Sequence, residues 1–388
     1  MTRLFLAVSF LMVCLMPASC ARAVRQKPVA DGAISPRLHQ MQVIGSHNSY
    51  KLAPQPELRE LLRPFYKSVD EFNYGHLSLT DQLNLGLRNL EIDVHHDPKG
   101  GLYADPMRAR MLTAAGIAPW PRPDADALKR PGFKVLHDAD FDFRSWNVDF
   151  ETCLAELRAW SAAHPEHTTI FITMNTKQSS SGVPGSVKPA AFDGPALHAL
   201  DQTIRNSLGA SRLLTPDDIR RGQSTLREGL RTHGWPTINE GRGRFLFVLD
   251  EEGAIRDRYL AQFPGLRGCV FFTTADPAAD HAAIFIINDP IKDEPTIRDL
   301  VHQGFIVRTR ADADTREARR NDRSRFEAAM RSGAQIITTD YYIPDRSADD
   351  RYMVRFDGGD FIRANPVTGI SEHEHPHPAD APQESTSR

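Results

Sequence analysis

Short apolar runs rich in β-branched and aromatic residues recur along the chain, and most are followed by a segment with helical periodicity. This alternation is typical of parallel strand–helix units, in which a helix covers the strand before it. The predicted strands are 41–45, 87–94, 133–137, 168–175, 244–250, 304–310 and 335–340. Two more runs, 269–273 and 283–288, compete for the sixth barrel position. Eight strands with one to spare are what a TIM barrel requires, so we expect a single-domain α/β barrel.

Two of the intervening helices are well marked. Residues 149–163 carry apolar side chains at three- to four-residue spacing, which predicts an amphipathic helix. Residues 321–332 form a second predicted helix, which Gly333 would end. The segment 178–192 is rich in Ser, Gly and Pro and predicts a surface loop.

The N-terminal residues have the features of an export signal. Arg3 precedes residues 4–16, which are apolar except for Ser9 and are fewer than the roughly 20 that span a bilayer. We expect this signal peptide to be cleaved after Ala23 and the protein to be exported, either to the periplasm or out of the cell. Lipid attachment at Cys20 is the alternative.

The predicted organisation follows from these boundaries. A signal peptide spans 1–23, a flexible segment 24–37, the barrel 38–370 and a disordered tail 371–388 that contains His and Pro. Cleavage would leave two cysteines, Cys153 and Cys269, too few for a disulfide framework. We expect Cys153 to be a buried thiol and not half of a bridge.

Composition narrows the classes of partner. The formal net charge is −3 over 388 residues, so there is no basic field of the kind that binds nucleic acid. The same near-neutrality gives no general attraction to an anionic bilayer, and a lipid substrate would have to be recognised locally. No protein partner is inferred.

Ionisable residues cluster where the predicted strands end, which is where TIM barrels form their active sites. Glu91 and Asp93 are two apart on one strand and therefore share a face. Two adjacent carboxylates repel unless a cation or a proton lies between them. Oxygen ligands of this kind suit calcium or magnesium, and Asn48 would add an amide oxygen. The alternative is a structural ion pair with Arg88 or Arg308.

Two histidines, His47 and His137, end predicted strands on either side of the carboxylate strand. Such a pair suits acid–base work on a phosphodiester, because one ring can take a proton while the other supplies one. Zinc binding by these two with His95 and His96 is a rival interpretation, although the neighbouring carboxylates favour a harder metal.

Three cationic residues form the predicted anion-holding side of the site. Lys177 follows the strand 168–175, whereas Arg308 and Arg310 share one strand face. Guanidinium groups suit phosphate oxygens. The alternative is that they neutralise Asp93, Asp250 or Asp340 structurally.

Five motifs together resemble the catalytic region of phosphoinositide-specific phospholipase C, and in particular its bacterial calcium-dependent group. They are GSHNSY at 45–50, LEID at 90–93, VLH at 135–137, VRTRADADT at 307–315 and SGAQIITTDY at 332–341. The first three are specific for the wider superfamily, and the last two indicate this branch. The similarity runs from about residue 40 to about residue 345.

The resemblance implies a distorted TIM barrel that binds one calcium ion, with magnesium as the second choice. It also implies that the protein cuts the bond between diacylglycerol and phosphorylated inositol. Asn48, Glu91 and Asp93 match the family's calcium ligands, and His47 and His137 match its catalytic histidines. The chain departs from the intracellular eukaryotic enzymes at the end of the fourth strand. Those enzymes have a metal-binding glutamate there, and this chain has Asn175. An amide can still bind calcium, with one charge less.

In the hypothesis for the reaction, the inositol 2-hydroxyl attacks the phosphorus. The expected substrate is a phosphoinositide or a related phosphodiester, met at a membrane surface. His47 and His137 would stabilise the transition state and protonate the leaving group, and Glu91 or Asp93 would accept the hydroxyl proton. One alternative is a glycerophosphodiester phosphodiesterase, although that family usually follows its first histidine with arginine, where this chain has Asn48. Another is a secreted barrel that binds phosphoinositol without cutting it, which Asn175 motivates.

Overall fold

The computed structural model describes residues 35–122, 125–345, 349 and 351–368. The predicted signal peptide, Cys20, the segment 24–34 and the tail 371–388 lie outside the described residues. At the start of the described part, Ile238 N donates to Pro36 O at 2.7 Å, and Arg37 pairs with Thr237. Within these residues, no helix has the length and apolar character that crossing a membrane requires.

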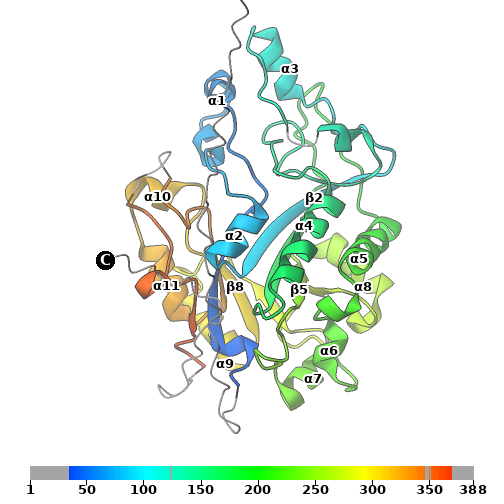
Figure 1. The fold of residues 1–388 in the computed structure, drawn as a ribbon, viewed down its shortest axis with the longest axis vertical. Coiled ribbons are helices and arrows are strands. Elements are labelled where there is room, and N and C mark those ends of the chain that lie inside the picture. The colour runs from blue at the N-terminus through cyan, green and yellow to red at the C-terminus, as the bar shows by residue number, and fades with distance from the viewer. Residues whose placement is uncertain (1–34, 123–124, 346–348, 350, 369–388) are drawn as a thin grey trace, which may run out of the picture. The chain divides into compact units, whose positions relative to one another are not determined.

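Eight parallel strands form a nearly closed barrel (Figure 1). They are β1 (Met41–Ser46), β2 (Asn89–Asp97), β4 (Ile170–Thr176), β5 (Phe245–Leu249), β6 (Phe271–Thr273), β7 (Ile284–Ile286), β8 (Ile306–Arg310) and β9 (Ile336–Thr339). Their hydrogen-bonded order is β6-β5-β4-β2-β1-β9-β8-β7, so the first strand and the last of the eight are neighbours. The ladder is interrupted between β6 and β7, the two ends of this order. The predicted α/β barrel is therefore confirmed.

Two further strands lie off the barrel path. β3 (Gly132–Val135) runs antiparallel to the second half of β2, and β10 (Ile362–Ala364) runs antiparallel to β1. The prediction of a barrel strand at 133–137 was therefore wrong. Both runs that competed for one barrel position, 269–273 and 283–288, contain barrel strands. An apolar run predicts an extended backbone, but it does not specify which neighbour the strand will pair with.

Helices cover the outside of the barrel (Figure 1). They are α2 (Leu79–Leu85), α4 (Phe150–Ala163), α5 (Gly194–Leu208), α6 (Pro216–Arg220), α7 (Leu226–His233), α8 (Gly253–Gln262), α9 (Glu294–His302), α10 (Arg316–Arg320) and α11 (Ser324–Ser332). The two marked helices of the sequence are α4 and α11. Asp149 caps α4 by accepting a hydrogen bond from Thr152 N, and Gly333 ends α11 with a left-handed φ of 79°.

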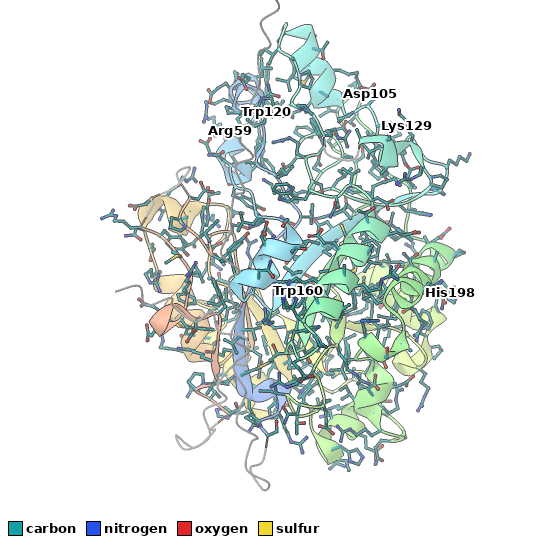
Figure 2. The ribbon with its side chains drawn as sticks, viewed as in Figure 1. Arg59, Asp105, Trp120, Lys129, Trp160 and His198 are labelled. Atoms are coloured by element: carbon teal, nitrogen blue, oxygen red, sulfur yellow. The ribbon has the colours of Figure 1, made fainter. Side chains whose placement is uncertain are left out.

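The apolar face predicted for α4 is the face that packs on the barrel. Its buried apolar residues are Phe150, Cys153, Leu154, Leu157 and Trp160. The Trp160 indole nitrogen donates to Asn84 Oδ1 at 2.7 Å, so its polar edge is also satisfied (Figure 2). Cys153 and Cys269 are both buried and no disulfide joins them, as expected for Cys153.

Two segments of the chain, one between β1 and α2 and one between β2 and α4, add a cap at the end of the barrel where β1 and β2 finish. It contains α1 (Pro56–Leu62), α3 (Met107–Ala114) and β3, and Figure 2 labels four of its side chains, Arg59, Asp105, Trp120 and Lys129. Leu58, Leu62, Val69, Leu112 and Phe143 form a small apolar core inside it. The cap therefore has packing of its own.

Candidate active site

The end of β1 brings its polar residues to the barrel mouth through a tight turn. Gly45 permits β1 to approach β2 closely, because a Cβ there would lie 2.4 Å from Asn89 Cβ. Asn48 adopts a left-handed φ of 50°, which Asn tolerates better than most residues. Its Nδ2 donates to Tyr74 Oη at 2.8 Å, and this bond fixes the orientation of the amide.

His47 is held by a carboxylate from the neighbouring strand end. Its Nδ1 lies 2.9 Å from Asp340 Oδ1, and its Nε2 lies 3.6 Å from Glu91 Oε1. Burial, together with the positive charge of Arg310, lowers the pKa of His47 well below its ordinary value. The ring is therefore neutral near pH 7. With Nδ1–H donating to Asp340, Nε2 is left as a proton acceptor.

His137 has the same kind of partner but a different origin. It follows β3 and reaches the site from a loop of the cap, not from the end of a parallel barrel strand. Its Nδ1 lies 2.9 Å from Asp142 Oδ2, and Asp142 also lies 3.2 Å from Lys51 Nζ. One face of the ring is near Phe72, with 5.8 Å between ring centroids. Each candidate catalytic histidine is therefore oriented through Nδ1 by one aspartate.

The carboxylate pair on β2 is neutralised by two of the three predicted anion-binding cations. Glu91 accepts a hydrogen bond from Arg308 Nη2, and Asp93 Oδ2 lies 2.9 Å from Lys177 Nζ. Burial alone would raise the pKa of Asp93, but the positive charge of Lys177 lowers it below its ordinary value. The alternative of a structural ion pair is thus realised at both carboxylates.

Arg310, the third predicted cation, is also engaged. Its Nη2 lies 3.3 Å from Asp340 Oδ2, and its Nε donates to Asp312 O at 2.9 Å. Asp312 in turn accepts from Asp340 N at 2.9 Å, and burial raises the pKa of Asp312 to about 7. Arg310 and Asp312 together fix the carboxylate that holds His47.

Three strands place polar residues side by side near Asp93. The register pairs Asp93 with Asn175 on β4, and Asp250 follows the last residue of β5, Leu249, which pairs with Met174. No side-chain hydrogen bond or ion pair of Asp250 occurs within the described part of the chain. Burial raises its pKa to about 6. The sequence predicts Asp250 as a carboxylate at a strand end. Its proximity to Asp93 depends on the strand register and could not be predicted in the same way.

The residues fit a hard cation in chemistry. Asn48, Glu91, Asp93 and Asn175 offer only oxygen ligands, and the Asp93 side chain is fully buried. Within the described residues, no three or more His, Cys, Asp or Glu side chains are already arranged to hold one metal ion.

The four histidines of the zinc interpretation do not form such a set either. His95 is buried against Tyr103, with 5.0 Å between ring centroids, and burial lowers its pKa to about 3. His96 stacks on Phe133 at 5.4 Å. These two rings therefore pack against aromatic residues of the cap and of β3.

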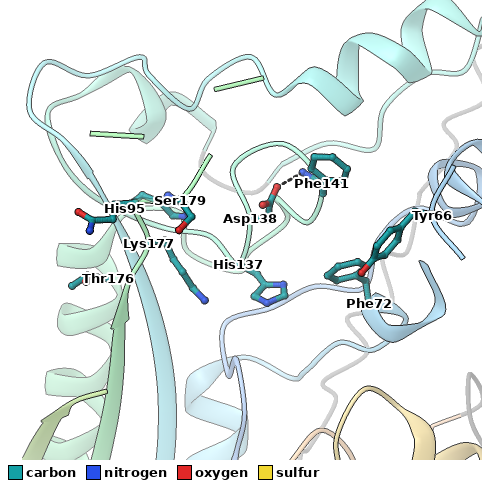
Figure 3. A pocket seen from close by; sticks show the side chains of 10 residues that line it. Tyr66, Phe72, His95, His137, Asp138, Phe141, Thr176, Lys177 and Ser179 are labelled. Carbon is teal, nitrogen blue, oxygen red and sulfur yellow. Dashed lines mark hydrogen bonds between the residues drawn. The ribbon is translucent and has the colours of Figure 1, made fainter. Parts of the chain in front are cut away.

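A cavity of about 460 Å³ opens beside His137 (Figure 3). It is lined by Tyr66, Phe72, His95, His137, Asp138, Phe141, Thr176, Lys177, Gln178 and Ser179. In Figure 3 the aromatic rings of Tyr66 and Phe72 lie on one side of the His137 ring, and the Lys177 amine lies on the other. The cavity therefore has one apolar wall and one cationic wall.

Comparisons with known proteins identify the family and support the fold. A family model described as Ca²⁺-dependent phosphoinositide phospholipase C matches residues 36–366. Among solved structures, the chain is similar to the calcium-dependent phosphoinositol-specific phospholipase C of a Pseudomonas species, with a TM-score of 0.53, 16% identity and coverage of 85% of this chain and 96% of that one.

A second similar structure is the Ca²⁺-dependent phosphatidylinositol-specific phospholipase C of Streptomyces antibioticus. Its TM-score is 0.47, with 18% identity and coverage of 79% of this chain and 96% of that one. No curated protein matches the chain in sequence. At these identities the Pseudomonas structure supports the fold, and the residues of the site are assigned from this chain's own geometry.

Proposed function

Because the chain belongs to the family of Ca²⁺-dependent phosphoinositide phospholipases C, we propose that it cleaves phosphatidylinositol-type lipids into diacylglycerol and an inositol phosphate. We further propose that calcium is the metal and that the protein is exported. The apolar N-terminal run motivates the last point. Detection of the protein in periplasmic or culture fractions, cleaved after Ala23, tests it.

One observation carries the proposal: two histidines, each bonded at Nδ1 to an aspartate, accompany a buried carboxylate pair at one barrel mouth. The distances are 2.9 Å for His47 to Asp340 and 2.9 Å for His137 to Asp142. A carboxylate at Nδ1 fixes the ring and leaves Nε2 to exchange a proton with substrate. Two such rings are what a displacement with one proton taken and one supplied requires.

The proposed reaction divides these roles. His47, neutral at pH 7, takes the proton of the inositol 2-hydroxyl at Nε2 as the hydroxyl oxygen attacks phosphorus. The bond from phosphorus to the glycerol oxygen breaks, and His137 protonates that oxygen as it leaves. Calcium, held by Asn48, Glu91 and Asp93, would lower the hydroxyl's pKa and offset the charge that develops on phosphate.

The apolar wall of the cavity supports a lipid leaving group. Tyr66 and Phe72 lie beside His137, the residue that would protonate that group. Phe65, next to Tyr66, is 83% exposed. An exposed aromatic side chain next to a cavity-lining residue in sequence suits contact with a membrane surface, which we propose as the place where the substrate is met.

The experiment that tests the function is hydrolysis of phosphatidylinositol and of glycerophosphoinositol, each with calcium, magnesium or excess chelator. Calcium-dependent release of diacylglycerol is the expected result. Cleavage of the deacylated diester alone would favour a glycerophosphodiester phosphodiesterase. Calcium binding without turnover of either compound would favour a barrel that binds without cutting.

A further inference from the structure

The two ion pairs on β2 differ in how easily they can open. Arg308 and Glu91 are both buried, with 3% and 4% of their side chains exposed. Arg308 also donates to Asn288 Oδ1 through its other terminal nitrogen, so it is held at two points. Lys177, in contrast, is 33% exposed while its partner Asp93 is fully buried. Only the lysine has solvent to move into.

Asp93 requires a positive charge close to it. Its side chain has 0% exposure, and an unpaired buried carboxylate costs several kcal/mol in general. Lys177 Nζ, at 2.9 Å from Oδ2, supplies that charge. The buried Tyr50 hydroxyl also contacts the Asp93 carboxylate. Tyr50 carries no charge, so Lys177 is the partner whose positive charge a bound cation would replace.

The Lys177 side chain is tethered at a fixed backbone position and faces the cavity. Its backbone N donates to Val94 O at 2.8 Å, which ties the end of β4 to β2. The amine lies on the wall of the cavity shared with His137 (Figure 3). Rotation of the flexible four-carbon side chain moves the charge from Asp93 into the cavity without moving the backbone.

We propose that Lys177 is an exchangeable counter-ion: its amine holds Asp93 in the metal-free protein, calcium displaces it, and the freed amine turns into the cavity to bind the substrate phosphate. The idea depends on the proposed function in that calcium is taken as the ion. Arg308 stays with Glu91 in both states. Metal and phosphate binding are then coupled, because the ion releases the cation that the phosphate needs.

Calcium affinity measures the competition directly. Titration calorimetry of chelator-treated protein compares the wild type with Lys177→Met and with Lys188→Met, the latter an exposed lysine of the same loop. Lys177→Met removes the competing amine and is expected to lower the dissociation constant for calcium about tenfold. Lys188→Met is expected to leave this dissociation constant unchanged. Equal or weaker binding by Lys177→Met, or no binding by the wild type, would overturn the proposal.

Amine labelling gives a second readout that needs no variant of Lys177. The labelling rate of Lys177, followed by peptide mass spectrometry, is expected to rise several-fold when calcium saturates the protein. Asp93→Asn is expected to give the fast rate without calcium, since the amine then has no carboxylate to hold it. A calcium-independent rate in the wild type would contradict the exchange.

These measurements separate the inference from the function. Hydrolysis of phosphatidylinositol together with unchanged calcium affinity in Lys177→Met would keep the function and remove the exchange. If Lys177→Met binds calcium more tightly but the wild type hydrolyses neither inositol substrate, the exchange is kept and the proposed function is removed.

Discussion

The two histidine–aspartate pairs have the same geometry but are built by different regions of the molecule. His47 and Asp340 lie 293 positions apart and meet because β1 and β9 are neighbours in the barrel. His137 and Asp142 are five positions apart in one loop of the cap. The first pair depends on the closure of the whole barrel, whereas the second depends on local loop packing. Matched substitutions in the two pairs test this difference.

Removal of either imidazole is expected to have the largest effect. His47→Ala and His137→Ala should each lower kcat on phosphatidylinositol by about 10² to 10⁴-fold, the usual contribution of a positioned acid or base. Calcium affinity from calorimetry should change little, because neither ring is a proposed ligand. Equal activity of His137→Ala and the wild type would remove that residue from the reaction.

Loss of the orienting aspartates should distinguish the two regions. Asp340→Asn and Asp142→Asn should each lower kcat by about 10 to 100-fold, because the ring loses its fixed orientation. Asp142→Asn also leaves buried Lys51 without a carboxylate, which costs about 3–5 kcal/mol. Asp340→Asn likewise removes a carboxylate from Arg310, but Arg310 is 13% exposed whereas Lys51 is 0% exposed. The unfolding temperature should therefore fall more for Asp142→Asn than for Asp340→Asn, and equal losses would contradict the comparison.

The aromatic wall of the cavity, made by Tyr66 and Phe72, lies beside His137. Phe72→Ala should lower kcat/KM on phosphatidylinositol by about tenfold, because roughly 1–2 kcal/mol of apolar contact with the lipid is lost. Cleavage of glycerophosphoinositol, which lacks acyl chains, should change little. A proportionate loss on both substrates would show that Phe72 supports the His137 ring instead of the leaving group.

The smallest expected effect is a shift in the pH profile. The pKa of His47 is lowered by burial and by Arg310, so the acidic limb of kcat/KM should lie below pH 6.5 in the wild type. Arg310→Gln removes one of the causes, so the pKa of His47 should rise and the limb should move to higher pH. A profile measured in 0.5-unit steps would detect it. A limb that stays in place would mean that another group sets it.

Much of this arrangement could be predicted from the sequence because ionisable residues end apolar runs. That pattern predicted that His47, Glu91 and Asp93 lie at one barrel mouth, since parallel strands end at the same side of a barrel. It failed for 133–137, where the same apolar pattern belongs to a strand that pairs antiparallel with β2. His137 still reaches the site, but from the cap.

The partners of the predicted residues were harder to foresee. Asp340 is visible as a strand end, but its contact with His47 depends on which strands are neighbours. Asp142 lies in a loop with no periodic pattern, and only the folded loop brings it to His137. Asp250 and the pairing of Lys177 with Asp93 depend on register in the same way. Residue type and position suggest candidates, and three-dimensional packing decides which of them touch.

The separation of His47 from Asp340 has a consequence for the order in which activity arises during synthesis. Half of one histidine–aspartate pair is made near the beginning of the chain and the other half near its end. A ribosome that stops before residue 340 releases a product whose His47 has no orienting carboxylate, however well its earlier strands have formed. The orientation of His47 is thus completed only when the last parallel strand, β9, has docked against the first, β1, and a shorter chain is expected to react more slowly than the complete one.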